Sequence, residues 1–445
     1  MIIRKAWIYF PAILFLAGLA HADVWKQIQP GGTIPTARSG HTMVEINNKI
    51  YLYGDESADT STRVTGNSIL LNDISIFDHD SLIWTPAEPA NNPPPARKNH
   101  SAVALGEKMY ILFGEGAQGS LLQDIWVYDP LSKEWQEQVV NSASKPAART
   151  GHSTVVMYGQ IFIYGGKTAT GVANDQWSYD LRSKTWVQRE NSGIPVYGHK
   201  AVADTGTKMY VHGGSDADET LLLDLLSYDL NTKKWENIAV EGDIPSPRAF
   251  HESTFENNKI KISGGRGYDS HGALTDLGDT WEFDTVAVKW TPKAKVSPHS
   301  FSSAVVIPKS SLQAEGEESK IFMFVGQRNG QFLNESWLYY PNESACMAKS
   351  ITASPKQLTL RKGNNGNVTI TVKGRDDCLV EGVMVTAKIK GKGKQLVGVS
   401  PGSQETDANG QAVFTINAKD KKGTAVLKFK ASGLNEVATV QVKVR

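Results

Sequence analysis

Cysteine is nearly absent from this chain of 445 residues, which holds only Cys346 and Cys378. Two cysteines exclude a small disulfide-stapled fold and a four-cysteine zinc site. An even count in an oxidising compartment favours a disulfide, so we predict a Cys346–Cys378 bond. It would close a loop of about 33 residues and add about 3–4 kcal/mol of stability on the loop-entropy model. Two unrelated buried thiols are the alternative.

Long hydrophobic runs are also absent, apart from one at the N-terminus. Arg4 and Lys5 precede a mostly apolar segment at residues 6–19, and Ala20-His21-Ala22 follows it. A basic start, a short apolar core and an A-x-A site are typical of a cleavable secretory signal. We therefore predict a signal peptide over residues 1–22, cleaved at about Ala22, and an extracytoplasmic mature protein (periplasmic, secreted or on the cell surface). An uncleaved anchor is the alternative, but the run is shorter than the ~20 residues a span needs. No later segment predicts an integral membrane helix.

Histidine spacings typical of metal sites are missing as well, so the sequence predicts no metal and no cofactor. Five histidines instead recur at one position of a repeated phrase: His41, His100, His152, His199 and His251. A residue that every repeat carries serves packing or turn formation, and we interpret these five as structural. Four other histidines follow residue 22 outside that position: His79, His212, His271 and His299.

What the sequence does have is a repeat marked by tryptophan. Trp25, Trp84, Trp135, Trp186, Trp235 and Trp290 follow one another at intervals of 49 to 59 residues. An aromatic residue stands seven positions before each of the last five, and aspartate follows it: Phe77-Asp78, Tyr128-Asp129, Tyr179-Asp180, Tyr228-Asp229 and Phe283-Asp284. A period near 50 residues indicates a propeller or an array.

Each repeat contains four short segments of strand-like alternation separated by turn residues, which is the unit of a β-propeller. The sixth repeat lacks a Trp strand of its own, and Trp25 has no strands of its own ahead of it. We therefore predict an all-β fold, a six-bladed propeller over residues 23–348. The N-terminal strand, residues 23–28, closes the last blade, since closure removes the exposed edge of the sheet array.

The glycine pair at the end of the second strand, the aromatic-Asp strand and the regularly placed Trp resemble the kelch repeat family. The resemblance covers about 320 residues. It departs from the pattern where Asp55, Glu115 and Gln327 replace the second glycine.

The C-terminal region differs in charge and pattern. Residues 349–445 contain 17 Lys and Arg against 7 Asp and Glu, a balance of +10, whereas residues 23–348 have 28 against 39, or −11. Segments such as 369–373 and 412–416 alternate with period two, which predicts a β-sandwich. The phrase Thr406-Asp407-Ala408-Asn409-Gly410 resembles immunoglobulin-like domains of the bacterial invasin type. We interpret the lysines as a solvated surface and predict no nucleic-acid binding.

Loops between the second and third strands gather on one face of a kelch propeller, and the family tends to bind there. Polar residues just after the glycines of those loops stand out, because they differ from repeat to repeat. We predict a ligand-binding surface that includes Glu115, Asp216, Arg266, Tyr268, His271 and Arg328. The guanidinium groups suit an anionic or hydroxyl-rich ligand. Ordinary solvated loop charges are the alternative.

No catalytic constellation stands out, and the sequence favours a secreted or periplasmic non-catalytic module. It would present the propeller face to a protein or polysaccharide partner, as an adhesion platform on an immunoglobulin-like stalk. One alternative is a sugar-active enzyme that resembles periplasmic sialic acid mutarotases. Another is a copper enzyme that resembles galactose oxidase, although both cysteines lie at or beyond the end of the propeller.

Overall fold

The computed structural model describes most of the chain. The described residues are 23–59, 68–204, 206–269, 271–308, 319–341, 349–374, 379–380, 382–407, 409–432, 434 and 436–445. The predicted signal peptide and both cysteines lie outside them. The described residues form two compact units, one at residues 23–341 and one at residues 349–445. Their regular structure is β-strand apart from two short 3₁₀ turns, η1 (Ala117–Gly119) and η3 (Gly391–Gln395), which confirms the predicted all-β fold.

The first unit consists of six antiparallel sheets of four main strands. Blades 1 to 3, each given from its inner strand to its outer strand, are β4 (Thr42–Ile46), β5 (Lys49–Ala58), β6 (Ser68–Asp78) and β7 (Ile83–Pro86); β8 (Ser101–Leu105), β9 (Lys108–Leu112), β10 (Ile125–Asp129) and β11 (Glu134–Glu137); β13 (Ser153–Met157), β14 (Gln160–Tyr164), β17 (Gln176–Asp180) and β18 (Thr185–Gln188).

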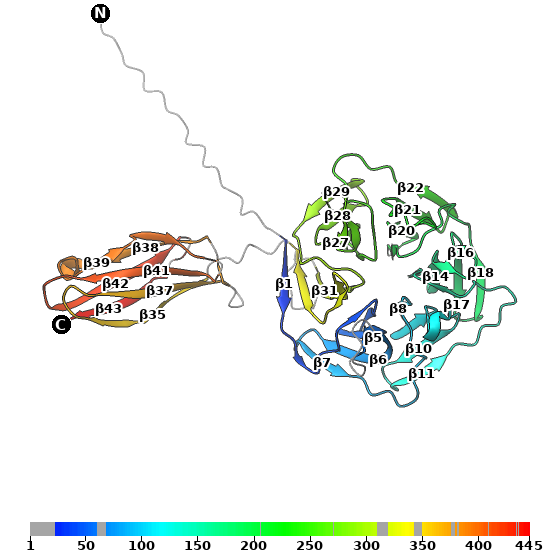
Figure 1. The fold of residues 1–445 in the computed structure, drawn as a ribbon, viewed down its shortest axis with the longest axis horizontal. Helices are drawn as coiled ribbons and strands as arrows, with labels where there is room; N and C mark the ends of the chain where they lie inside the picture. The colour runs from blue at the N-terminus through cyan, green and yellow to red at the C-terminus, as the bar shows by residue number, and fades with distance from the viewer. Residues whose placement is uncertain are drawn as a thin grey trace, which may run out of the picture. The chain divides into compact units, whose positions relative to one another are not determined.

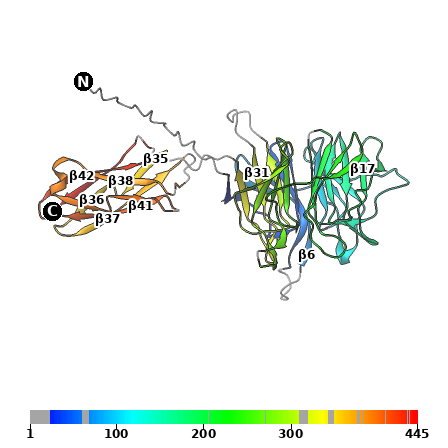
Figure 2. The same ribbon diagram turned by 90° about the horizontal axis from the view of Figure 1, so that it is seen from above.

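Blades 4 to 6, in the same order, are β19 (Lys200–Ala203), β20 (Lys208–His212), β21 (Leu225–Asp229) and β22 (Lys234–Asn237); β24 (Glu252–Glu256), β25 (Lys259–Ser263), β28 (Thr280–Asp284) and β29 (Lys289–Lys293); β30 (Ser303–Ile307), β31 (Lys320–Phe324), β34 (Ser336–Tyr340) and β1 (Val24–Ile28). The sheets are arranged radially about a centre, as Figure 1 shows. Seen from the side, the strands of the ring run from one face to the other (Figure 2).

Shorter strands decorate the edges of these blades. They are β2 (Gly31–Gly32), β3 (Arg38–Ser39), β12 (Arg149–Thr150), β15 (Lys167–Thr168), β16 (Gly171–Val172), β23 (Arg248–Ala249), β26 (Arg266–Tyr268), β27 (Leu274–Asp276), β32 (Gln327–Arg328) and β33 (Gln331–Phe332). Most of these short strands lie in the connection between the second and third strands of a blade or pair with that connection.

The sixth blade is completed by the N-terminal strand. β1 pairs antiparallel with β34, and Trp25 lies opposite Tyr339. Their ring centroids are 5.1 Å apart, and Trp25 Nε1 donates to Thr280 Oγ1 of the neighbouring blade at 3.0 Å. The first strand of the unit is therefore held by two blades, and its pairing with β34 closes the ring.

The Trp and aromatic-Asp positions of the repeat have structural roles. In every blade the outer-strand Trp lies opposite the third-strand aromatic, and their centroids are 5.0 to 5.3 Å apart. Such tilted pairs add to the burial of apolar area. The aspartate after the aromatic accepts backbone N–H groups of the turn that follows; Asp129, for example, bonds the N–H of Leu131 at 2.9 Å.

The arginine of the repeated phrase is also structural. Arg38, Arg97, Arg149 and Arg248 are fully buried. Each forms a two-pronged ion pair with an aspartate that lies within the third strand (Asp73) or directly before it (Asp124, Asp175 and Asp279). The guanidinium also donates to the carbonyl at the end of the second strand, as Arg97 does to Phe113 at 3.0 Å. These pairs tie the loop between the second and third strands to its blade.

The second unit is a two-layered β structure. One sheet has the order β35 (Ser350–Ser354), β37 (Asn365–Lys373), β41 (Gln411–Ala418) and β39 (Val397–Ser400). The other has the order β36 (Gln357–Leu360), β43 (Ala438–Val444), β42 (Gly423–Ala431), β38 (Met384–Ile389) and β40 (Ser403–Glu405). Their facing side chains form one buried apolar cluster that includes Val368, Phe414 and Phe429.

Candidate functional site

The inner strands surround a central channel. It encloses a cavity of about 180 Å³ lined by the first residues of all six inner strands and by the residues that precede them. Because the first and second strands of a blade are antiparallel, with Thr42 opposite Tyr53 in blade 1, each inner strand starts at the edge where the second strand ends. The mouth of the channel and the loops between second and third strands therefore share one face of the propeller, which we call the loop face.

A chain of backbone hydrogen bonds encircles this mouth. The position two residues before each inner strand is occupied, in blade order, by Gly40, Asn99, Gly151, Gly198, Phe250 and Phe301. The N–H of one member donates to the carbonyl of the member in the preceding blade over five of the six junctions, at 2.7 to 3.0 Å. All six have positive φ, between 49° and 81°. The blades are thus joined at the channel by main-chain bonds as well as by side-chain packing.

The chain of bonds is interrupted between blades 1 and 2. There the N–H of Asn99 donates to the carboxylate of Asp55 at 2.9 Å and not to the carbonyl of Gly40. Asp55 is buried, and burial raises the pKa of its carboxyl group well above the ordinary value. Asp55 stands where the other blades have the second glycine of the repeat, so this departure has a structural use. The prediction that Glu115 and Gln327 also replace that glycine is wrong, because Gly114 and Gly326 occupy the position and accept the same backbone bond as Gly166, Gly214 and Gly265.

The repeated histidines link adjacent blades and are uncharged. His100, His152 and His199 each bond, through Nε2, the hydroxyl group that starts the preceding inner strand, at 2.7 to 2.8 Å. Those hydroxyls belong to Thr42, Ser101 and Ser153. Burial lowers the pKa of the ring in all five repeated histidines, to about 3 in His199. The structural interpretation of these histidines therefore agrees with their contacts.

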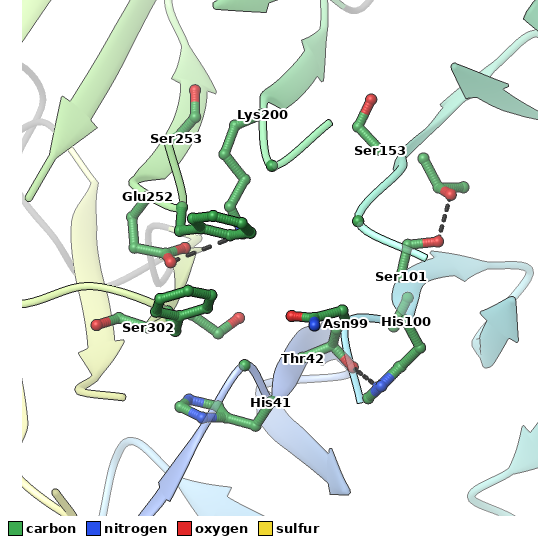
Figure 3. A pocket seen from close by; sticks show the side chains of 18 of the residues that line it. His41, Thr42, Asn99, His100, Ser101, Ser153, Lys200, Glu252, Ser253 and Ser302 are labelled. Carbon is green, nitrogen blue, oxygen red and sulfur yellow. Dashed lines mark hydrogen bonds and ion pairs between the residues drawn. The ribbon is translucent and has the colours of Figure 1, made fainter. Parts of the chain in front are cut away.

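Two blades break this pattern. The first residue of the inner strand is Thr42, Ser101, Ser153 or Ser303 in four blades, but Lys200 in blade 4 and Glu252 in blade 5. Lys200 Nζ lies 3.7 Å from Glu252 Oε1 across the interior of the channel, and Figure 3 shows the two side chains meeting there. They are the two side chains of opposite charge among the described residues that line the cavity.

Two aromatic residues also break the symmetry of the mouth. Where four blades have Gly or Asn, blades 5 and 6 have Phe250 and Phe301, at φ values of 55° and 52°. Their rings stack with centroids 4.1 Å apart, and both line the cavity. A bulky residue at positive φ is an outlier that costs on the order of 1–3 kcal/mol and points to a functional constraint.

Among the predicted loop residues, Glu115 and Asp216 have contacts within the loops. Glu115 lies 3.8 Å from Lys98 Nζ, which also contacts Glu56 at 3.4 Å. Asp216 accepts the backbone N–H groups of Asp218 and Thr220, both at 2.9 Å. Asp216 therefore shapes its own loop, and Glu115 belongs to a charged cluster over blades 1 and 2.

The other four predicted residues lie over blades 5 and 6. Arg328 pairs with Glu335 at 3.0 Å and donates to the carbonyl of Pro298 at 2.9 Å, so it takes the place of the repeated arginine, whose sequence position is His299. His271 is exposed beside Asp269. Tyr268 is 47% exposed. Arg266 lies on β26 next to β23, the strand that leads into Phe250.

Sequence reasoning missed Lys200, Glu252 and the Phe250–Phe301 pair. The signal was present, because the phrase after the repeated arginine aligns all six copies and shows Lys, Glu and Phe where the other copies have small or hydroxyl residues. Among the described residues, no group of three or more His, Cys, Asp or Glu is placed to hold a metal ion.

The family comparison bears on the whole propeller. The model for the KLHDC2/KLHL20/DRC7 Kelch-repeats domain matches residues 16–196 and 189–357. The chain belongs to this kelch-repeat family. The match spans most of the chain and includes all six blades, which agrees with the kelch resemblance of the repeats.

The chain matches curated relatives at low identity. The chain is 25% identical over 343 residues to "Putative protein tag-53" of Caenorhabditis elegans, covering 72% of this chain and 24% of that protein. It is 24% identical over 432 residues to "Acyl-CoA-binding domain-containing protein 4" of Arabidopsis thaliana (91% and 62%). It is 25% identical over 336 residues to "Kelch domain-containing protein 10" of Xenopus tropicalis (71% and 79%). The chain thus spans less than two thirds of the first two.

These relatives contradict the predicted function. The sequence favours a secreted or periplasmic adhesion module, with a sialic acid mutarotase or a copper enzyme as alternatives. The relatives are instead proteins of animals and plants, among them a kelch domain-containing protein, so that prediction is wrong. It relied on the N-terminal leader and the stalk-like second unit, features outside the blades that carry the similarity. Within the described part of the chain, no helix is long and apolar enough to cross a membrane.

Proposed function

We propose that this chain is a protein-binding kelch propeller, and that a segment of its partner docks on the loop face at the mouth of the channel. The observation that carries the proposal is the Phe250–Phe301 stack. Four of the six blades show that Gly or Asn suffices at this position, so the blades do not require these rings. Aromatic side chains supply much of the binding energy at protein interfaces.

The surroundings of the stack fit an interface. Tyr197 lies against Phe250 with centroids 6.1 Å apart, which extends the aromatic surface toward blade 4. Beside it, Lys167 lies over the Tyr197 ring at 3.8 Å and bonds Glu219 at 2.7 Å. An apolar centre with a polar rim is the usual anatomy of an interface between proteins. Arg266 and Tyr268 complete this rim over blade 5.

The test replaces both rings with the residue that other blades use. The double variant Phe250→Gly/Phe301→Gly loses the contacts of both rings, which destabilises the protein, but it also loses the backbone strain of two bulky residues at positive φ. Because these two effects oppose each other, we expect the melting temperature to change little. A photo-crosslinking phenylalanine at Tyr268 reports on the loop face. One at Tyr158, which is 69% exposed in the turn between β13 and β14, reports on the opposite face. Both are placed in the full chain and irradiated in an extract of the cells that make it.

We expect a discrete protein cross-link from position 268, none from position 158, and loss of the former in the double glycine variant. Equal cross-linking from both positions would contradict the proposal. So would a cross-link that the double glycine variant retains. A polysaccharide partner, which the sequence left open, would give no protein cross-link at position 268.

We also propose that residues 349–445 form an immunoglobulin-like domain of the invasin type, separate from a propeller domain of residues 23–348. Two facing sheets of four and five strands support this. The test is to express residues 349–445 alone. Cooperative unfolding and amide exchange protection along β37, β41 and β42 are expected, and an unfolded fragment would contradict the boundary.

A further inference from the structure

The lysines of the second unit are concentrated on one of its two outer surfaces. In the sheet of β35, β37, β41 and β39, the outward-facing positions hold mainly Thr, Ser, Asn and Gln, and Lys373 is their one charged residue. In the sheet of β36, β43, β42, β38 and β40, these positions hold four lysines: Lys388, Lys428, Lys430 and Lys443. Charges that serve solubility are spread over a surface with both signs interspersed, so solubility alone does not account for this distribution.

Two neighbouring strands bring four lysines together on this sheet. Lys388 of β38 lies directly opposite Lys428 of β42, and the Cβ atoms of opposite residues are about 4.5–5.5 Å apart. Lys430 is two positions further along β42 and therefore on the same side. Lys390 follows β38, and its N–H donates to the carbonyl of Val426 at 2.9 Å, which keeps it in line with Lys388. We call Lys388, Lys390, Lys428 and Lys430 the lysine face.

The lysine face costs the free protein stability. Like charges directly opposite each other destabilise a sheet, and contact with the Lys390 side chain, together with its charge, lowers the pKa of Lys428. Among the outward-facing positions of the five strands, Glu405 is the one carboxylate, and it lies opposite Met384 on the short edge strand β40. Lysine also protects sheet edges from pairing, but β42 is the middle strand of five. Neither folding nor edge protection therefore accounts for this cluster.

The residue types on this side of the sheet favour an extended anionic surface as the partner. Lysine carries a compact point charge, whereas arginine forms the two-pronged bonds that recognise a single carboxylate or phosphate. The outward-facing positions of these five described strands contain no arginine, and no aromatic residue on which a nucleic acid base would stack. Side chains that alternate along neighbouring strands project from one side of the sheet, so all four ammonium groups can meet one surface at once.

We infer that the lysine face binds the surface of an anionic lipid bilayer, with its ammonium groups against the charged headgroups. Each lysine near such a surface strengthens binding by about fivefold, so four together suffice for reversible attachment without an inserted helix. The attachment is electrostatic, and screening by salt weakens it. This inference concerns the second unit, goes beyond the protein-binding function proposed for the propeller and does not rest on it.

The experiment is co-sedimentation of residues 23–445 with lipid vesicles. This chain contains every described residue and leaves out the leader, because an apolar segment can enter a bilayer by itself. The vesicles are phosphatidylcholine, alone or with about one third phosphatidylserine. The test variant, Lys388→Gln/Lys390→Gln/Lys428→Gln/Lys430→Gln, removes the four charges of the lysine face. The control variant, Lys356→Gln/Lys362→Gln/Lys421→Gln/Lys422→Gln, removes as many charges from exposed turns between strands of the same unit.

We expect the natural chain to sediment with the phosphatidylserine vesicles and not with phosphatidylcholine alone. The test variant should bind about a hundredfold more weakly, and the control variant should lose much less, because its lysines do not lie together on one side of the sheet. The test variant should also melt no lower than the natural chain, since the substitutions remove like charges from adjacent strands. Lost binding is then not a result of unfolding.

Three results would overturn the inference. They are equal sedimentation with both kinds of vesicle, an equal loss of binding in the two variants, and retention of the chain by heparin without binding to the phosphatidylserine vesicles. The last result would identify a sulfated polysaccharide, and not a bilayer, as the partner of the lysine face.

Discussion

The carboxylate of Asp55 accepts the backbone N–H of Asn99 at 2.9 Å, at the one junction of the channel mouth where no backbone carbonyl does so. Asp55 has a φ of 83° and stands where blades 3, 4 and 5 have the second glycine of the repeat. Its side chain also lies against Gly40, since a Cβ there would come within 2.7 Å of Asp55 Oδ2. The ring thus stays continuous through a buried acidic side chain.

Asp55→Asn should stabilise the protein at neutral pH. Burial raises the pKa of Asp55 in the folded state, so the folded state binds the extra proton, and stability falls as pH rises from the unfolded pKa toward the folded one. Asparagine tolerates positive φ and its oxygen can accept the Asn99 N–H without a charge. Melting temperatures measured from pH 4 to 8 should fall less steeply in the variant than in the natural protein. An identical pH slope in both would show that Asp55 is ionised throughout.

Asp55→Ala should destabilise the protein, in contrast to Asp55→Asn. It removes the acceptor of the Asn99 N–H and places alanine at a strained φ, so we expect a loss of about 1–3 kcal/mol in the free energy of unfolding. Asp180→Asn is the control, because that aspartate lies in an exposed turn. Chemical denaturation measures both, and a smaller loss in Asp55→Ala than in Asp180→Asn would be evidence against the role of Asp55.

Arg97→Ala and Arg266→Ala should separate structural from surface arginines. Arg97 is fully buried and pairs with Asp124 at 2.7 Å, and breaking such a pair costs about 3–5 kcal/mol because a charge is left buried without its partner. Arg266 is on a loop strand and only partly buried, so its loss should change the free energy of unfolding by less than about 0.5 kcal/mol. Urea denaturation of both variants gives the comparison, and similar losses would contradict it.

Trp25→Ala should open the ring at blade 6. Truncation removes the Tyr339 contact and the bond to Thr280, and loss of a buried tryptophan costs about 3–5 kcal/mol. Hydrogen exchange should speed up in β34 more than in β10 of blade 2. Gln27→Ala in the same strand is the control, since Gln27 is exposed. Uniform acceleration across all blades would mean that Trp25 stabilises the unit globally and does not close one blade.

The Cys346–Cys378 bond remains a prediction, since both residues lie outside the described part of the chain. Peptide mapping of oxidised protein without reduction should find the two cysteines in one linked peptide pair. Reduction should lower the free energy of unfolding by about 3 kcal/mol on the loop-entropy model. Two free thiols, each alkylated in full, would show the prediction to be wrong.

The leader at residues 1–22 and the extracytoplasmic location also remain predictions. The test is the N-terminus of the protein purified from the cells that make it. Removal of the leader leaves Asp23 as the first residue, which mass spectrometry reads directly. An intact N-terminus that begins before Ala20 would contradict cleavage at the A-x-A site.

The sequence by itself determined the fold, because each blade repeats the same solution and six copies reinforce one another. The spacing of Trp135 from Tyr128 predicts their pairing on adjacent strands, and the structure has them opposite each other. The five repeated histidines are interpreted as structural for the same reason. Local periodicity and turn chemistry carry this information, since within blades 1 to 5 the main strands pair with neighbours close in sequence.

The candidate site was decided by the tertiary structure. Lys200 and Glu252 are 52 positions apart in the sequence, yet both start inner strands, and only the packing of blade 4 against blade 5 brings their side chains to 3.7 Å. The same holds for the contact of Phe250 with Phe301. Conversely, the sequence places Arg328 on the predicted ligand-binding surface, but in the structure it pairs with Glu335 and takes the place of a repeated arginine. A repeat pattern specifies what each blade needs, whereas the meeting of different blades at the axis depends on three-dimensional closure.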